Sequence, residues 1–291
     1  MPELPEVETV RRGLKPVLTG AKIVSVTLNR KDLRFPFPHA FSERLIGRTI
    51  MEIGRRAKYL LFYLSQNETL LSHLGMSGSW RVENNLLREK HFSTKKLVAH
   101  DHFLMDVQAQ NGKVYRLIYN DVRRFGFMLL ADTMKLDEHI LLRKLGLEPT
   151  DNRLSGAYLQ KAFVNKKTSL KTALLNQSIV AGLGNIYVCE VLWRSHLSPE
   201  RSAFTLAFKN IHACELAHCL AKNIREVITE AISAGGSSLR DYVHTDGSLG
   251  YFQHYFSVYG REGKKCLQCG VPIVRILQSG RSSFYCPQCQ K

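Results

Sequence analysis

The sequence predicts a multidomain α+β protein with an N-terminal β-sandwich, a helical domain after it and a C-terminal β-hairpin held by a metal. Three observations predict this class. Short apolar runs bounded by Gly, Asn or Asp extend to Leu130, helical periodicity follows from about residue 150, and two Cys-x-x-Cys pairs lie near the C-terminus. The 291 residues suffice for two domains and a small appendage.

The N-terminal region is predicted to start with a helix and to continue in strands. Val7, Val10 and Leu14 share one helical face, and Thr19-Gly20 ends the pattern. Asn-Gly within residues 110–113 predicts a hairpin turn, and the basic, irregular residues 88–96 indicate an exposed loop. Seven runs have strand composition, which predicts a sandwich or a barrel-like domain: 23–28, 49–53, 59–64, 69–73, 103–107, 114–118 and 127–130.

A helical region is expected after a boundary near residues 147–151. In its middle, Gly182 and Gly184 predict tight left-handed turns, and Asn185 is expected to cap the helix that follows. Such a turn exposes backbone N–H groups that suit a phosphate, although an ordinary helix–helix connection explains the same residues. The predicted helices span 156–164, 169–176, 185–195 and 205–233.

The C-terminal end carries the strongest metal signal. After a polar, glycine-rich stretch at 235–250, the pairs Cys266/Cys269 and Cys286/Cys289 have the spacing of a tetrahedral four-thiolate zinc site. Residues 271–277 and 283–285 alternate like two strands, with Arg281 ending the turn between them. A module this small takes its folding energy from the metal. Arg281 by itself could equally be a solvated turn residue.

The net charge indicates which class of partner the protein binds, and the cysteine content indicates the cellular compartment. The formal net charge of +16 implies a polyanionic partner, with nucleic acid first and an anionic membrane surface as the rival. No apolar run approaches the length of a spanning helix and no signal-peptide pattern is present, so we expect a cytoplasmic protein without a membrane partner. The other three cysteines, Cys189, Cys214 and Cys219, are expected to be buried free thiols, as in a reducing cytoplasm.

The first nine residues could carry covalent chemistry. Removal of Met1 would leave Pro2 with a secondary α-amine, and such an amine titrates near ~8. A neutral amine beside the carboxylates of Glu3 and Glu6 can attack an electrophilic carbon. The alternative is an ordinary helix start, because Pro and Glu are also favourable in a first helical turn.

Together these motifs resemble the formamidopyrimidine-DNA glycosylase family of bacterial base-excision enzymes. The resemblance covers essentially the whole chain, in order. It implies an N-terminal β-sandwich (1–148), a helix-two-turn-helix domain (149–235), a lesion-capping loop and linker (236–257) and a zinc-finger β-hairpin (258–291). The matching segments are Met1 to Thr9, Lys58, His73-Leu-Gly-Met-Ser-Gly78, Arg123-Arg-Phe-Gly126, Gly182-Leu-Gly-Asn185, Gly250-Tyr-Phe252 and the four cysteines.

The resemblance also implies roles for single residues. Pro2 matches the nucleophile that attacks C1′ of the damaged nucleotide, and Glu3 the proton donor that helps to open the sugar. Lys58 matches the lysine assigned to β-elimination, and Arg281 the arginine that grips a phosphate and assists δ-elimination. One structural zinc is implied, because four thiolates leave no open coordination position. The implied partner is double-stranded DNA with oxidised purines or abasic sites, bound by a monomer.

The remaining carried-over residues contact DNA in the family. A base inside a duplex must be flipped out to reach Pro2, which leaves a hole in the stack. Met76, Arg123 and Phe125 match the side chains that fill it, although Met76 and Phe125 alone would be taken for core residues. The other implied DNA contacts are His73, His100, Arg124, Lys166, Asn185 and Tyr251.

Two departures and two alternatives remain. Asp121-Val122 stands where the family commonly has Asp-Pro, and His100 follows an unusual segment at 92–96, so the sequence departs from the family pattern around the hole-filling loop and not at the residues of the chemistry. Leu4 is typical of the oxidised-purine branch; the endonuclease VIII branch, which acts on oxidised pyrimidines, is the alternative enzyme. A zinc-containing DNA-binding protein without catalysis is the alternative of another class.

Overall fold

The computed structural model describes residues 2–84, 98–237 and 250–291. The chain forms two compact units, Met1–Arg143 with Gly235–Tyr251, and Lys144–Ala234 with Phe252–Lys291. The predicted loop at 88–96 and most of the predicted lesion-capping loop lie outside the described residues. The four-part division of the chain stays a prediction.

The first unit begins with helix α1 (Leu4–Leu18), which confirms the predicted N-terminal helix. Glu3 is its N-cap residue, and a capping box with Glu6 satisfies backbone donors that the first turn leaves without helical partners. The face formed by Val7, Val10, Leu14 and Leu18 is fully buried, and Thr19 ends the helix. This burial fixes how the extreme N-terminus enters the domain.

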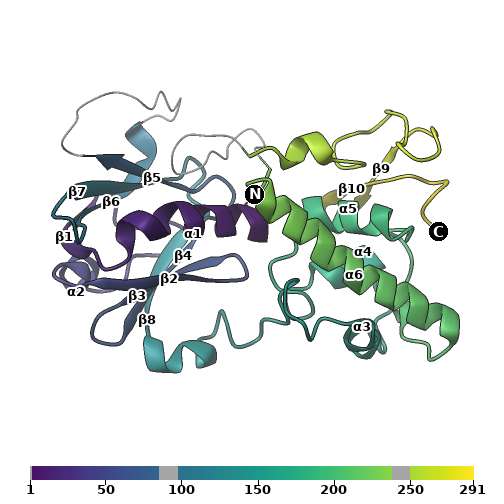
Figure 1. The fold of residues 1–291 in the computed structure, drawn as a ribbon, viewed down its shortest axis with the longest axis horizontal. Helices are drawn as coiled ribbons and strands as arrows, with labels where there is room; N and C mark the ends of the chain where they lie inside the picture. Colours follow the sequence, from purple (N-terminus) through teal and green to yellow (C-terminus); the bar gives the residue numbers. More distant parts are fainter. Residues whose placement is uncertain (1, 85–97, 238–249) are drawn as a thin grey trace. The chain divides into compact units, whose positions relative to one another are not determined.

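Two four-stranded antiparallel sheets follow α1 in the first unit (Figure 1). One has the order β1-β6-β7-β5, and the other β2-β3-β4-β8. A single buried cluster takes side chains from both sheets and from α1, so the predicted sandwich is confirmed. The strands are β1 (Lys22–Leu28), β2 (Ile50–Arg56), β3 (Tyr59–Leu64), β4 (Glu68–His73), β5 (Ser79–Asn84), β6 (Asp101–Gln108), β7 (Val114–Asn120) and β8 (Phe127–Asp132).

Strand β5 is absent from the sequence prediction. In this strand Trp80 is the one fully buried apolar residue. Arg81 and Glu83 face the other way and Val82 is only partly buried, so the alternation of apolar and polar residues is too short to be recognised. The predicted turn at 110–113 is confirmed, since Gly112 has φ 78° between the paired strands β6 and β7. The short elements are α2 (Phe41–Leu45), η1 (Val98–His100) and η2 (Thr133–Glu138).

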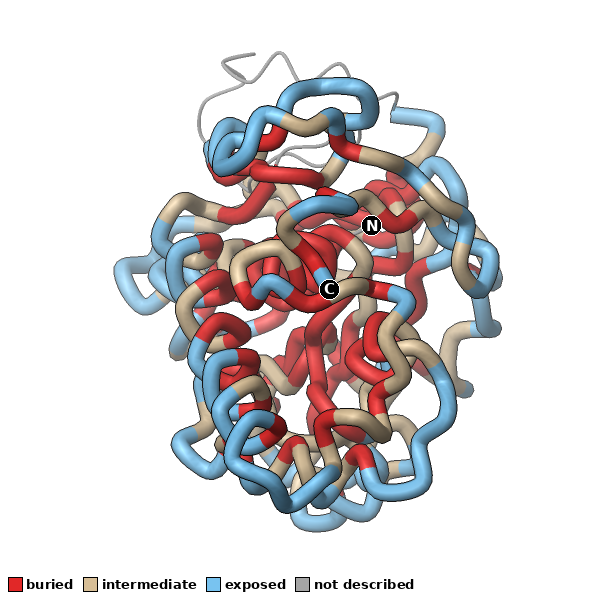
Figure 2. Tube along the Cα trace, turned by 90° about the vertical axis from the view of Figure 1, so that its right-hand side faces the viewer, coloured by how far each residue is buried: buried red, intermediate tan, exposed pale blue. Residues whose placement is uncertain are grey.

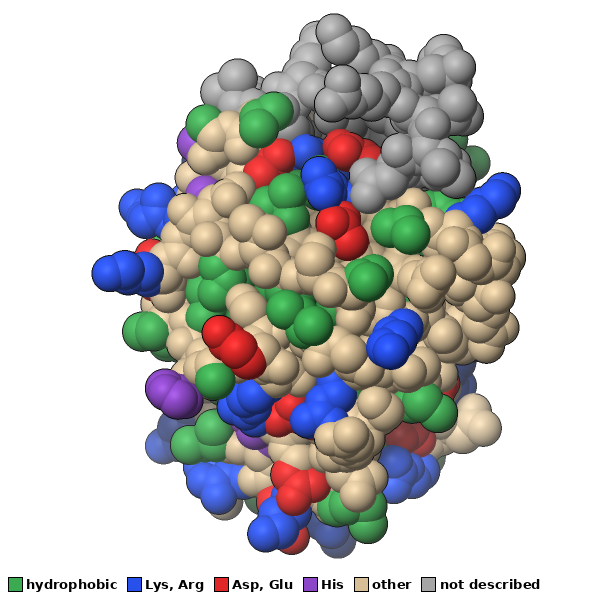
Figure 3. Space-filling model, turned by 90° about the vertical axis from the view of Figure 1, so that its left-hand side faces the viewer, with side chains coloured by type: hydrophobic (Ala, Val, Ile, Leu, Met, Phe, Trp, Pro, Cys, Tyr) green, Lys and Arg blue, Asp and Glu red, His purple; other side chains and the backbone are tan. Residues whose placement is uncertain are grey.

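On the face shown in Figure 3, lysine and arginine side chains are scattered among acidic and apolar ones. The positive charge of the chain is therefore not gathered into a patch on the visible part of this face. In the described chain, no helix is long and apolar enough to cross a membrane.

The second unit is helical, as predicted, with its buried segments inside and its outer turns exposed (Figure 2). The long helix begins later than predicted. Asn210 caps it by accepting a hydrogen bond from the Ala213 N–H (2.8 Å), and residues 203–206 form a separate 3₁₀ turn before it. The elements are α3 (Gly156–Phe163), α4 (Leu170–Leu175), α5 (Asn185–Arg194), η3 (Ala203–Leu206), α6 (Ile211–Ser233) and η4 (Phe252–Tyr255).

The predicted C-terminal hairpin is confirmed as β9 (Val274–Gln278) and β10 (Arg281–Tyr285). Its two-residue turn has positive φ at both positions, Ser279 (48°) and Gly280 (72°), which is the tight turn whose twist suits a hairpin. Arg281 is the exposed first residue after that turn.

The expectation for the three remaining cysteines is wrong in part. Cys189 is buried, but Cys214 and Cys219 are exposed. Both lie on α6, whose apolar stripe follows Ala213, Ala217 and Leu220 instead. All three cysteines are free thiols, as expected.

Candidate functional site

The N-terminal residues are held tightly. Pro2 and Glu3 are buried. The Glu3 N–H donates to Glu6 Oε2 (2.8 Å), and Glu6 Oε1 accepts from the N–H and hydroxyl of Ser237 (2.8 and 3.0 Å). Glu6 therefore joins the start of α1 to the residue that precedes the undescribed stretch 238–249. Its hydrogen bonds give it a positioning role beside Pro2 and Glu3.

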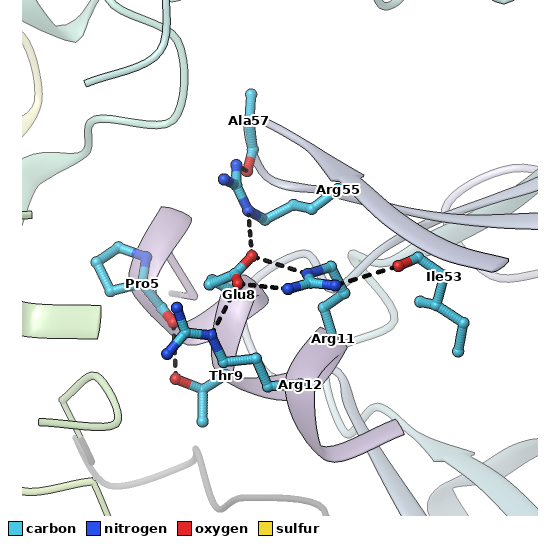
Figure 4. A network of polar contacts seen from close by, with 8 residues as sticks. All are labelled: Pro5, Glu8, Thr9, Arg11, Arg12, Ile53, Arg55 and Ala57. Atoms are coloured by element: carbon cyan, nitrogen blue, oxygen red, sulfur yellow. Dashed lines mark hydrogen bonds and ion pairs between the residues drawn. The ribbon is translucent and has the colours of Figure 1, made fainter. Parts of the chain in front are cut away.

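Two residues after Glu6 on α1, Glu8 binds three arginines (Figure 4). Its carboxylate accepts hydrogen bonds from Arg11 (2.8 and 3.0 Å), Arg12 (2.9 Å) and Arg55 (3.0 Å). Burial alone would raise the pKa of Glu8, but the hydrogen bonds from these arginines outweigh it and lower the pKa to about 2. Glu8 is therefore an anion at any physiological pH.

The Glu8 cluster reaches the turn that carries Lys58. Arg55 Nη1 donates to the carbonyl of Ala57 (3.0 Å), the residue before Lys58, and Ala57 has a left-handed φ of 51°. Lys58 itself lies in this turn between β2 and β3 and is buried, with 9% of its surface exposed. The network thus connects α1, just beyond Pro2 and Glu3, with the backbone beside Lys58.

His73 ends β4 as a neutral ring. Its Nδ1 accepts the N–H of Gly75 (3.1 Å), and its ring stacks on Phe127 at 5.1 Å. Burial, with further contributions from the Lys58 and Arg34 charges, lowers the pKa of His73 to about 4. Since Nδ1 is an acceptor, the proton resides on Nε2, which is then a hydrogen-bond donor.

The structure brings the predicted hole-filling residues together. Gly75 packs so closely on the loop at 125–126 that an added Cβ would lie 2.3 Å from the Phe125 carbonyl carbon, which places Met76 next to that loop. Arg123 and Phe125 are exposed, with the guanidinium 5.1 Å from the ring centroid. Arg124 has a left-handed φ of 56°, which is uncommon for a residue with a side chain.

Asp121 holds this loop, a role that its residue type and position in the sequence do not reveal. The fully buried carboxylate accepts from the Gly126 N–H (2.8 Å) and the Ser77 hydroxyl (2.5 Å), and Ser77 Oγ accepts the N–H of Arg123 (3.0 Å). The Asp-Val pair therefore forms an ordered loop without the family's usual proline. His100 lies beside it, because its carbonyl accepts the Asp121 N–H (3.0 Å).

The glycine turn in the second unit is only partly as predicted. Gly182 has φ 89°, but Gly184 is extended at φ −133° and is itself the N-cap of α5. The prediction that Asn185 caps the helix is wrong. Its Nδ2 donates instead to the Ser282 carbonyl (3.0 Å), next to Arg281. Gln177 shapes the turn, since its Oε1 accepts the Gly182 N–H (2.8 Å).

Asn185 and Arg281 are thus joined through Ser282, within one unit. The buried Lys171 reinforces the joint, because its ammonium donates to the Ser282 carbonyl (2.9 Å) and to Ser283 Oγ (2.6 Å). Lysine is rarely buried, so the sequence offered no sign of this role. Lys166 is exposed in the turn after α3. Tyr251, the last residue of the first unit, is 65% exposed.

The four predicted zinc ligands converge. Their sulfur atoms all lie within 4.8 Å of one another, with Cys266–Cys289 at 4.0 Å and Cys269–Cys286 at 3.4 Å. A tetrahedral zinc with ~2.3 Å bonds to sulfur needs separations of about 3.8 Å, so the cluster fits one ion with four thiolate ligands. Such a closed site serves structure, and here it supports the hairpin that bears Arg281.

Family models cover most of the chain. The formamidopyrimidine-DNA glycosylase N-terminal domain matches residues 1–128, the formamidopyrimidine-DNA glycosylase H2TH domain matches 145–243, and a zinc finger found in FPG and IleRS matches 263–291.

Relatives match over the full length. A curated formamidopyrimidine-DNA glycosylase of Bartonella bacilliformis is 78% identical, and that of Bartonella henselae 77%, each over 100% of both chains. Among solved structures, a Lactococcus lactis FPG mutant with Fapy-dG-containing DNA is 37% identical with a TM-score of 0.84 over 100% of both chains. The Lactococcus lactis enzyme with DNA containing an abasic site is 35% identical, with a TM-score of 0.84 over 99% of both.

Proposed function

Because the chain belongs to the formamidopyrimidine-DNA glycosylase family, we propose that it is a bifunctional glycosylase and abasic-site lyase that removes oxidised purines from double-stranded DNA. The observation that carries this proposal is the 78% identity to a curated relative over the full length of both chains, both termini included. The substrates would be 8-oxoguanine and formamidopyrimidines, which a bacterial cell must excise from duplex DNA.

Base removal follows from the chemistry of the N-terminus. The Pro2 nitrogen bonds to C1′ of the flipped nucleotide as the bond from C1′ to the base breaks, and the base leaves with the proton that the amine loses. Glu3 donates a proton to the ring oxygen and so opens the sugar. The product is an iminium ion joining Pro2 to the sugar. The capping box that orders Glu3, with the Glu3 N–H on Glu6 (2.8 Å), supports this role because it holds the α-amine and the carboxyl in a defined arrangement.

Strand cleavage then uses the iminium as an electron sink. The iminium acidifies the C2′ proton, Lys58 assists its removal, and the 3′ phosphate leaves in β-elimination. Loss of the 5′ phosphate in δ-elimination follows, assisted by Arg281. The neutral His73 and Asn185 are suited to phosphate contacts, since each offers an N–H donor without the cost of burying a further charge.

We assign recognition of the base on the opposite strand to Arg123. Arginine has only donors, and cytosine presents the adjacent acceptors O2 and N3 to a guanidinium. Adenine flanks its N1 acceptor with a donating amino group, so one contact becomes unfavourable. The Asp121–Ser77–Arg123 hydrogen bonds support this assignment because they order the backbone from which Arg123 projects.

The test is reductive trapping. With borohydride and a duplex containing 8-oxoguanine, we expect a protein–DNA crosslink that mass spectrometry locates at Pro2. A matched control carries one extra glycine before Pro2, which turns the Pro2 amine into an amide and should abolish the crosslink at Pro2, whereas a glycine added after Lys291 should not. A crosslink at Lys58 with Pro2 free would refute the assignment.

The endonuclease VIII-like alternative is tested in the same assay. One lactococcal relative was solved with DNA containing an oxidised pyrimidine, so the substrate range needs a direct comparison. Duplexes bearing 8-oxoguanine, a formamidopyrimidine and an oxidised pyrimidine should be cleaved in parallel, with the two purine lesions fastest. Faster cleavage of the pyrimidine lesion would favour the alternative, and binding without nicking would indicate a non-catalytic DNA-binding protein.

A further inference from the structure

Helix α5 packs against the buried cluster that contains zinc ligands, and Trp193 is one of the side chains that make this contact. Trp193 lies near the C-terminal end of α5 and packs against the buried cluster that includes the ligands Cys266 and Cys286. Cys189, one helical turn earlier, belongs to the same cluster. The zinc site is therefore covered on one side by a face of α5.

The indole nitrogen of Trp193 is buried and makes no hydrogen bond with the described residues. An indole N–H can only donate, and a buried donor without an acceptor costs free energy, so such atoms are rare in folded proteins. Tryptophan at a purely apolar contact could be replaced by phenylalanine without this cost. The orphaned donor therefore indicates an acceptor that becomes effective in the metal-loaded protein.

The acceptor at this contact is the sulfur of Cys266, a member of the buried cluster that Trp193 packs against; the indole N–H is directed toward it without completing a hydrogen bond. The same sulfur already accepts one backbone donor, the Gln268 N–H, at 3.5 Å. Cys286 receives a similar bond from the Cys289 N–H at 3.4 Å.

Electrostatics give the bond its strength. Four thiolates around one Zn²⁺ leave a net charge of −2 on the cluster. Donors aimed at the sulfur atoms spread that charge, and hydrogen bonds to ionised acceptors are stronger than those between neutral groups. We propose that Trp193 is a positioning residue of the zinc site, whose indole N–H donates to the Cys266 thiolate and so makes metal retention depend on α5.

The hydrogen bond from Trp193 to Cys266 would connect α5 to the zinc-bound hairpin at a second point. At its N-terminal end, Asn185 donates to the Ser282 carbonyl (3.0 Å), beside Arg281. At its C-terminal end, Trp193 would hold the metal ligand Cys266. The hairpin would then be fastened to one rigid helix at two places about one helix length apart.

The test measures zinc release from the full-length, zinc-loaded protein to a colorimetric chelator. Trp193→Phe keeps an aromatic ring and removes the donor, and we expect release at least ~10-fold faster, as for the loss of other partners of metal ligands. The matched control is Trp80→Phe. Trp80 is the other tryptophan of the chain, lies in the sandwich core and donates to Ser72 Oγ (3.2 Å), so its loss should leave zinc release unchanged.

A second variant separates the hydrogen bond from packing. In the Trp80→Phe background, Trp193 is replaced biosynthetically by benzothienylalanine, in which sulfur stands for the N–H while the bicyclic shape is kept. We expect the same acceleration as in Trp193→Phe. In the cobalt-substituted protein, the sulfur-to-cobalt charge-transfer band should also move to lower energy, because the thiolate loses a donor. Release at the parental rate in the isosteric variant, or faster release with an unshifted band, would overturn the proposal.

Discussion

The carboxylate of Glu8 should be a major source of stability for the N-terminal unit. Its pKa falls from an ordinary value of 4.5 to about 2 because three arginines donate to it. Since one pKa unit corresponds to ~1.36 kcal/mol, the charged form should stabilise the folded unit by about 3 kcal/mol. Glu8→Gln keeps the side-chain shape and removes the charge, so it should lose most of this free energy at pH 7.

The sign of the pH dependence follows from the direction of the pKa change. A carboxyl whose folded pKa is depressed contributes fully above its unfolded pKa of about 4.5 and loses that contribution as the pH falls towards about 2. The difference in unfolding free energy between the parent and Glu8→Gln should therefore shrink from about 3 kcal/mol at pH 7 to about 1.5 kcal/mol at pH 3. Other carboxyl groups titrate alike in both proteins and cancel.

The assay is urea unfolding followed by tryptophan fluorescence. In a Trp193→Phe background, Trp80 is the remaining tryptophan, and it reports on the sandwich core. Glu43→Gln is the matched control, because Glu43 is exposed on α2; it should change the unfolding free energy by less than ~0.5 kcal/mol. A Glu8→Gln protein as stable as the control, or a loss that is equal at pH 7 and pH 3, would refute the reasoning.

Other predictions concern the remaining site residues. Burial should hold the imidazole of His73 neutral, with an NMR titration midpoint near pH 4 instead of about 6.5, so its charging should oppose folding only as the pH falls below about 6.5; a midpoint above 6 would contradict the buried environment. Cys266→Ser, or zinc chelation, should unfold the hairpin and abolish DNA binding in gel-shift assays while Trp80 fluorescence persists; normal nicking by zinc-free protein would show that the metal is dispensable. Arg281→Ala should keep its zinc, as measured by metal analysis, yet lose DNA binding or strand cleavage because one charge-assisted phosphate contact disappears. Arg123→Ala should reduce the preference for 8-oxoguanine opposite cytosine over adenine, a preference of roughly ten- to a hundredfold if one unpaired contact costs ~1–3 kcal/mol, whereas Phe125→Ala should slow both substrates; an unchanged ratio in Arg123→Ala would exclude Arg123 as the reader.

Features encoded by local spacing could be predicted from the sequence. The cysteine pairs specify a four-thiolate site because ligands with two residues between them already meet at one metal, and the sulfur atoms do converge within 4.8 Å. Helix α1 follows from a period of 3.6 residues, which reports the buried face of a segment without knowledge of its neighbour, and strand β3 follows from a short, continuous run of apolar residues. Where such a signal covers few residues, as in β5, the same reasoning fails.

The polar framework of the site depended on the tertiary structure. Asn185 has the residue type of a helix cap, yet its side chain donates to Ser282, 97 residues away. Arg55 meets Glu8 across 47 residues, and Asp121 meets Ser77 across 44. A buried polar side chain must bond to whatever acceptor or donor the fold brings near it, and that choice outweighs its local preference. The sequence by itself therefore determined the elements, the metal ligands and the family motifs, whereas long-range hydrogen bonding decided which residues hold Lys58, Arg123 and Arg281 in place.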